Sequence, residues 1–199
     1  MAEIKAFNRW TVEGIKVEDP GLVRYINLNP TFVPRTGARY AGNRFHKSRT
    51  FIIERLMNKL QNPGHKGKKH FKSSYHCTGK GSTIYKIMEE VLEVIEKKTS
   101  KNPIDVIVKA IENGAPREEI IMIEYGGARY PKPVECSPQR RIDFVLRLLV
   151  QGSYQKSFNS KKSIVDTLSS EIIAAYNKSS NALVISKKNE IERQADSSR

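Results

Sequence analysis

The sequence predicts a mainly α-helical protein: a body of about six helices, one protruding two-stranded β-hairpin and a basic N-terminal extension. Apolar residues recur at helical spacing in six stretches, of which the last is the weakest. A Gly-Gly pair joins two runs of β-prone residues at 119–136. The 199 residues, 38% of them hydrophobic, suit one domain of ordinary size. We expect residues 1–48 to form the extension and residues 49–199 to form the helical domain.

The clearest helix is expected at 82–98, where one apolar stripe lies opposite a row of glutamates. This pattern is typical of a core helix with an acidic outer face. An earlier helix is expected at 49–61. It carries Arg55 and Lys59 four residues apart, which predicts one basic face.

Two further helices are expected to begin with a capping residue followed by proline. The Asn-Pro pair at 102–103 opens one that ends at the Asn-Gly pair of 113–114. The Ser-Pro pair at 137–138 opens another that ends at Gly152. The last two expected helices cover residues 160–177 and 183–195. We expect the C-terminal sequence QADSSR to fray.

The hairpin is predicted from its turn. Gly126 and Gly127 favour a two-residue type I′ turn between the strands. That register places Pro131 and Pro133 at non-hydrogen-bonded positions, where a missing N–H costs no ladder bond. Because an isolated two-stranded ribbon is marginally stable in water, another element must pack against it. The local sequence leaves two alternatives open: an ordinary surface hairpin, or a hairpin that reaches a binding partner.

Positive charge is concentrated in one part of the chain. The net charge is +14 and the pI is about 9.8. Residues 35–86 carry thirteen basic side chains and one acidic side chain, Glu54, which gives that segment +12. Such a segment would repel itself without a polyanionic partner, and its scattered clusters favour folded RNA. The basic clusters are Arg35, Arg39, Arg44, Lys47 and Arg49; Lys66, Lys68, Lys69 and Lys72; Arg140 and Arg141; Lys161 and Lys162; and Lys187 and Lys188.

The sequence CTGKGST at 77–83 is similar to part of a nucleotide-binding loop. Because Gly81 separates Lys80 from Ser82 and no strand precedes the segment, ATP hydrolysis is not expected. A Gly-Lys-Gly turn before a helix can nevertheless bind an RNA phosphate through backbone N–H groups and the helix dipole. The plainer alternative is a loop that Ser82 caps. No catalytic constellation is present, so we do not expect an enzyme.

No metal or other cofactor is expected. His65, His70, His76 and Cys77 lie close together, but they lack the paired spacing of structural zinc ligands. Two cysteines are too few for a disulfide framework, which favours a reducing compartment. The sequence has neither a membrane-spanning apolar run nor a signal-peptide core. We therefore expect a cytoplasmic protein without a membrane partner.

Three ordered motifs resemble the universal small-subunit ribosomal protein seven family: GKGST before a helix, YGGARYPKPVECSPQRR as hairpin and helix, and ISKKNEIERQADSSR at the end. The resemblance covers residues 38–199. GARYAGNRFHKSRTFIIERLMNKLQ and the insertion NPGHKGKKHF are similar to the archaeal and eukaryotic branch, since the shorter bacterial form lacks the N-terminal arm and the insertion. The resemblance implies a bundle of about six helices with a protruding hairpin.

The resemblance also implies function. It implies that the protein binds the 3′ major domain of small-subunit ribosomal RNA and nucleates assembly of the head. The hairpin tip would lie near exit-site transfer RNA and the messenger path, and neighbouring head and platform proteins would be further partners. The residues implied to face ribosomal RNA are Lys80, Arg140, Arg141, Lys187 and Lys188. The tip residues are Tyr125, Gly126, Gly127, Ala128 and Arg129.

One alternative is a free-standing nucleic-acid-binding regulator of the helix-turn-helix type, with residues 139–151 as the reading helix. Such a helix needs polar base-contacting side chains along its exposed face, and this one has few beyond its first turn. An enzyme that modifies RNA is a more distant alternative, because no catalytic constellation supports it.

Overall fold

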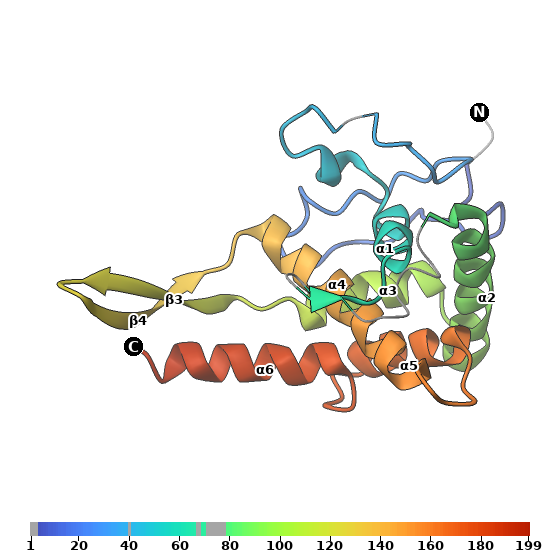
Figure 1. Cartoon of the computed structure of the whole chain (residues 1–199). Coiled ribbons are helices and arrows are strands. Elements are labelled where there is room, and N and C mark those ends of the chain that lie inside the picture. Colours follow the sequence, from blue (N-terminus) through green and yellow to red (C-terminus); the bar gives the residue numbers. More distant parts are fainter. Residues whose placement is uncertain (1–3, 40, 67–68, 71–78) are drawn as a thin grey trace.

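The computed structural model describes residues 4–39, 41–66, 69–70 and 79–199. Within these ranges it has six α-helices and a protruding two-stranded antiparallel hairpin (Figure 1), so the predicted fold class is confirmed. The helices are α1 (Ile52–Leu60), α2 (Gly81–Thr99), α3 (Pro103–Gly114), α4 (Pro138–Ser157), α5 (Ile164–Tyr176) and α6 (Leu183–Asp196). The hairpin consists of β3 (Glu118–Tyr125) and β4 (Ala128–Glu135). A 3₁₀ turn (His46–Arg49) and two short paired strands, β1 (His65–Lys66) and β2 (Lys69–His70), complete the described elements.

Helix α5 lies at the centre of the body, in contact with α2, α3 and α4. Its Leu168 and Ile172 are completely buried, as their helical spacing predicts. The N-terminal segment packs against the same core through Trp10 and Leu22. The Trp10 indole Nε1 donates a hydrogen bond of 3.0 Å to Glu96 on α2. The division of the chain at residue 48 stays a prediction.

Helix α4 continues past Gly152, so the prediction that this glycine ends the helix is wrong. A Cβ atom built at Gly152 would lie 3.1 Å from the Cδ atom of Glu171 and 3.1 Å from the Cβ atom of Leu183. The glycine therefore allows α5 and the start of α6 to approach α4 closely. This packing outweighs the cost of about 1 kcal/mol that glycine imposes inside a helix.

Several helix starts differ from the predicted positions. Helix α1 begins at Ile52, because residues 46–49 form the 3₁₀ turn. Helix α2 begins at Gly81, so Ser82 lies inside it and is not its cap. Helix α5 begins after Ser163, whose hydroxyl accepts a hydrogen bond of 3.1 Å from the Asp166 N–H. The predicted Asn102 cap of α3 is confirmed, since its side chain accepts from the Ile104 N–H.

The hairpin has the predicted register. Tyr125 pairs with Ala128 next to the turn, and Pro131 and Pro133 face Met122 and Ile120 at alternate, non-hydrogen-bonded pairs. The φ angles of 59° at Gly126 and 81° at Gly127 fit a type I′ turn, which requires positive φ at both central residues. The ribbon protrudes from the helical body (Figure 1), and its residues 121–132 are all exposed.

Helix α6 supports the base of the hairpin and runs alongside it (Figure 1). The Glu192 carboxylate accepts a hydrogen bond of 3.0 Å from the Arg117 N–H, just before β3. Arg199 donates to both carboxylate oxygens of Glu118, at 2.6 and 2.8 Å. The expectation of a frayed C-terminus is therefore wrong, because the last residue is tied to the hairpin.

Candidate nucleic-acid interface

A surface groove lies between the 3₁₀ turn, α1 and α4, and we call it the α1/α4 groove. It has a volume of about 510 Å³. Four cationic side chains line it, against one carboxylate, Asp143. Two phenylalanine rings lie in the same lining. The complete set of lining residues is Phe45, His46, Lys47, Lys59, Gln139, Arg140, Asp143, Phe144 and Arg147.

Asp143 is already neutralised by two cations. Its carboxylate accepts from the Lys47 ammonium at 3.0 Å and from the Arg55 guanidinium at 3.2 Å. Burial alone would raise the pKa of Asp143, but the Lys47 hydrogen bond and the Arg55 charge outweigh it and lower the pKa. The carboxylate therefore stays ionised, and the groove keeps a net positive potential. The Arg55 side chain is itself buried. Of the two cations on the predicted basic face of α1, only Lys59 therefore reaches the surface.

Arg140 is exposed and reaches toward the hairpin. Its Nε and Nη2 atoms each lie 2.6 Å from a Glu119 oxygen, which is the forked geometry of a strong arginine–carboxylate pair. The hydrogen bond to Glu119 raises the pKa of Arg140. Arg140 therefore connects the wall of the groove with the base of β3.

Lys59 and Arg147 were not predicted as site residues. Arg147 lies seven residues after Arg140, so both fall on one face of α4, and this spacing is the signal that could have identified it. The Arg147 guanidinium lies over the Phe144 ring at 5.8 Å, and the Arg44 guanidinium lies over the Phe45 ring at 5.1 Å. Both contacts are within cation–π range.

The start of α2 lies beside a second pocket. Lys80 occupies the cap position without a side-chain cap hydrogen bond, and its side chain is exposed. A Cβ atom built at Gly81 would lie 4.0 Å from the Cζ atom of Arg35. Arg35, Lys47 and Lys59 line this pocket together with Gly79 and Gly81. The helix dipole adds partial positive charge here, so this end of α2 favours an anion.

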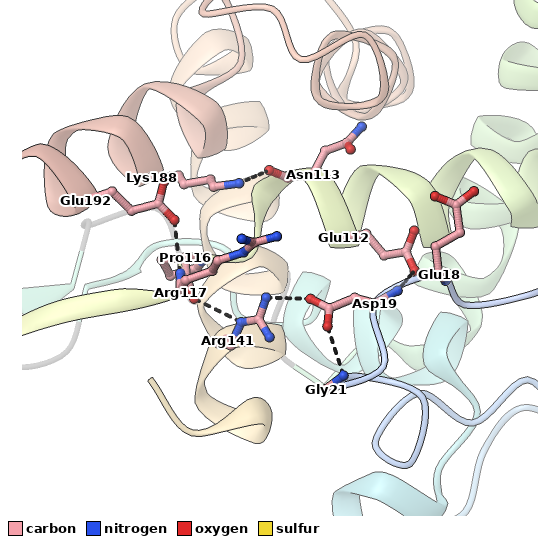
Figure 2. Close-up of polar contacts among 10 residues, drawn as sticks. All are labelled: Glu18, Asp19, Gly21, Glu112, Asn113, Pro116, Arg117, Arg141, Lys188 and Glu192. Carbon is pink, nitrogen blue, oxygen red and sulfur yellow. Dashed lines mark hydrogen bonds and ion pairs between the residues drawn. The ribbon is translucent and has the colours of Figure 1, made fainter. Parts of the chain in front are cut away.

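Arg141 is buried, whereas Arg140 is exposed, and Figure 2 shows the contacts of the Arg141 guanidinium. Arg141 is only 8% exposed, and its Nε atom donates a hydrogen bond of 3.0 Å to the Pro116 carbonyl. Its Nη2 atom lies 2.6 Å from Asp19 Oδ2 in the N-terminal segment. The guanidinium is thus occupied inside the protein.

The two lysines of α6 also differ in their exposure. Lys187 is exposed and pairs with Glu190 on the same helix at 2.6 Å. Lys188 is half-buried and donates to the Asn113 carbonyl at 2.8 Å (Figure 2). Burial lowers the pKa of the Lys188 ammonium, Glu192 opposes that shift, and nearby cations reinforce it.

The other predicted RNA-binding residues are scattered. Arg39, Arg44 and Arg49 are exposed in the segment that precedes α1, and Lys161 and Lys162 are exposed before α5. Lys66 and Lys69 lie in β1 and β2, of which the structure describes only the backbone. Lys68 and Lys72 lie outside the described residues.

The described ranges hold no group of three or more acidic, histidine or cysteine side chains that could bind a metal ion. His76 and Cys77 lie outside those ranges.

Cys136 is a free, buried thiol at the end of the hairpin, and burial raises its pKa to about 11. None of the helices that the structure describes combines the length and the apolar character needed to cross a membrane.

Comparisons with known proteins agree with the resemblance found in the sequence. The family model described as ribosomal protein S7p/S5e matches residues 22–199. A protein of Nanoarchaeum equitans named small ribosomal subunit protein uS7 is 51% identical over 197 residues, which cover 99% of this chain and all of that relative. A protein of the same name from Archaeoglobus fulgidus is 42% identical over 197 residues, 99% of this chain and 96% of that relative. The chain therefore belongs to the ribosomal protein S7p/S5e family, whose members are structural, non-enzymatic components of the ribosome.

Proposed function

We propose that this protein is a constituent of the small ribosomal subunit that binds the 3′ major domain of its ribosomal RNA and nucleates assembly of the head. The observation that carries the proposal is the α1/α4 groove, where Lys59, Arg140 and Arg147 surround a carboxylate that Lys47 and Arg55 already neutralise. RNA phosphates supply the matching negative charge, and each neutralised phosphate adds to affinity by counterion release. The groove opens between helices, which suits recognition of a folded RNA surface by shape.

The proposed RNA contacts extend from this groove to other cations of the basic clusters in the sequence. Arg141 is assigned a different task, because its guanidinium is buried and paired: it positions α4 and the base of the hairpin. Arg140, its exposed neighbour, is the member of the pair proposed to meet RNA. The proposed phosphate contacts are Arg39, Arg44, Lys47, Arg49, Lys59, Lys66, Lys68, Lys69, Lys72, Lys80, Arg140, Arg147, Lys161, Lys162, Lys187 and Lys188.

We further propose that the hairpin tip, Tyr125 to Arg129, lies near exit-site transfer RNA and the messenger path. Three observations support this role. The base of the hairpin is tied to α4 and α6, its type I′ turn is tight, and Tyr125 is 80% exposed at the tip. Such a ribbon can hold a rigid tip away from the body. The exposed apolar residues Met122 and Ile123 on β3 suit contact with a neighbouring head or platform protein.

Footprinting of the purified protein on transcripts of the 3′ major domain tests the RNA proposal. We expect protection at a defined junction, and weaker binding by at least tenfold when Lys59 and Arg147 are both changed to Glu. The matched control is the double change of Lys97 and Lys98 to Glu, two exposed lysines at the far end of α2. Evenly scattered protection together with equal affinity for duplex DNA would contradict the proposal.

The same transcripts test the separate role of the hairpin. Deletion of Gly126, Gly127 and Ala128 should leave RNA affinity unchanged, because the tip lies away from the α1/α4 groove. In assembled subunits the same deletion should alter chemical protection of transfer RNA in the exit site. Loss of RNA affinity on deletion would show instead that the hairpin is a primary anchor.

A further inference from the structure

We infer that the α1/α4 groove binds an unpaired RNA nucleotide, with its base stacked on Phe45 and its flanking phosphates on Lys59 and Arg147. This inference rests on the proposed function and makes it more specific. Phosphate contacts alone need only cations, whereas this groove also presents aromatic rings. Aromatic rings add affinity for bases that are free to stack, and bases inside a duplex are not free.

Phe45 is the first observation that favours a base. Its side chain is 52% exposed although it lies within the lining of a groove. Its backbone has φ 56° and ψ 27°, in the left-handed region that costs a non-glycine residue free energy. An exposed phenylalanine in this conformation gains nothing from core packing. A base that stacks on the exposed part of the Phe45 ring would give this side chain a binding role.

The arginines beside the two rings are the second observation. Arg44 lies over Phe45 and Arg147 lies over Phe144, so a planar cation accompanies each aromatic ring. Guanidinium planes stack on bases and also contact phosphates. Phe144 is partly buried against the core, which fixes the wall of the groove on the α4 side.

The aromatic rings of the groove, rather than its charge, distinguish RNA from an acidic peptide as the occupant. A peptide carboxylate would need cations alone, and it would make no use of the exposed part of the Phe45 ring. A nucleotide uses both features at once, since its base is planar and apolar on its faces and its phosphates are anionic. Gln139 and His46 line the same groove and offer polar atoms to the edge of the base.

The experiment compares two single-stranded probes of equal length and charge: a ten-nucleotide oligoadenylate and its abasic ribose-phosphate counterpart. We expect the full-length protein to bind the oligoadenylate about tenfold more tightly at one fixed salt concentration. The change Phe45→Leu should abolish that preference without changing affinity for the abasic probe. The control Phe158→Leu should retain it, because Phe158 is 61% exposed and lies beyond the other end of α4.

A second variant tests stacking directly. In Phe45→Trp, the oligoadenylate should quench the emission of the new tryptophan, beyond any change at Trp10, and the abasic probe should not. Three outcomes would overturn the inference in a protein that still binds the 3′ major-domain transcript. They are equal affinity of the wild-type protein for both probes, a preference for the oligoadenylate that survives Phe45→Leu, and competition by polyglutamate as effective as that by the oligoadenylate. Failure to bind that transcript would overturn the proposed function and the inference with it.

Discussion

Arg141 on α4 and Asp19 in the N-terminal segment form an ion pair, with 2.6 Å between Nη2 and Oδ2 (Figure 2). The other Asp19 oxygen accepts from the Gly21 N–H at 2.9 Å, and Arg141 also binds the Pro116 carbonyl before β3. Burial would raise the pKa of Asp19, but the Arg141 and Gly21 hydrogen bonds outweigh it and lower the pKa. One guanidinium thus connects the N-terminal segment, the base of the hairpin and α4.

We expect Arg141→Gln to lower the free energy of unfolding by about 2 kcal/mol, because it leaves Asp19 without its charged hydrogen-bond donor. Asp19 is 23% exposed at its side chain, so water limits the loss. Urea unfolding followed by circular dichroism measures it. The control Arg140→Gln, at an exposed residue, should cost less than 1 kcal/mol. Equal stability of Arg141→Gln and the wild type would show that the pair has no structural role.

Acid should weaken the protein through Asp19 and Asp143. The folded-state pKa of each lies below 3.8, the ordinary value of an aspartate, so around and below pH 3.8 the unfolded chain binds more protons than the folded chain. The stability that each pair contributes is therefore present above about pH 4 and is lost as the pH falls through the folded-state pKa. Unfolding in urea from pH 6 to pH 2.5 should show this loss. Asp143→Asn should reduce the slope below pH 4, and an unchanged slope would contradict the assignment.

Local chemistry predicted some features of this protein and could not predict others. The type I′ turn and the two prolines depend on neighbouring residues only, so their positions were readable from the sequence. Arg140 and Arg141 look alike in sequence, yet a helix turns successive residues by about 100°, which exposes one and buries the other. The role of Gly152 likewise depends on Glu171, which is distant in sequence.

The α1/α4 groove illustrates the same limit. Lys47 and Arg140 were predicted as RNA contacts from their charge, but nothing in the sequence indicates that Asp143 would hold Lys47 from another helix. Lys59 and Arg147 lie on predicted helices, and only the packing of α1 against α4 brings them to one surface. Clusters of charge can be read from a sequence. Which of those charges form ion pairs, and which stay available to a partner, can be seen only in the folded structure.

Gly114 should be sensitive to a single added methyl group. A Cβ atom built there would lie 2.4 Å from the Cγ1 atom of Val184 on α6, and valine has little freedom to move aside. We expect Gly114→Ala to lower the free energy of unfolding by about 1–3 kcal/mol through overpacking. Gly42→Ala is the control, because nothing lies within 4 Å of a Cβ at that residue. If both variants unfold at the same urea concentration, α6 is free to shift away from α3.

The pair between Arg199 and Glu118 should determine how tightly the base of the hairpin is held. Exposed ion pairs contribute about 0.2–1 kcal/mol, so Arg199→Ala should raise amide hydrogen exchange in β3 and β4 by up to about fivefold. Global stability should change little, because the ion-pair partners of Arg199, Glu118 and Asp196, lie outside the hydrophobic core. Lys187→Ala removes a comparable pair within α6 and is the control. Exchange that rises equally in both variants would mean that α6 supports the hairpin through packing and through Glu192 rather than through its last residue.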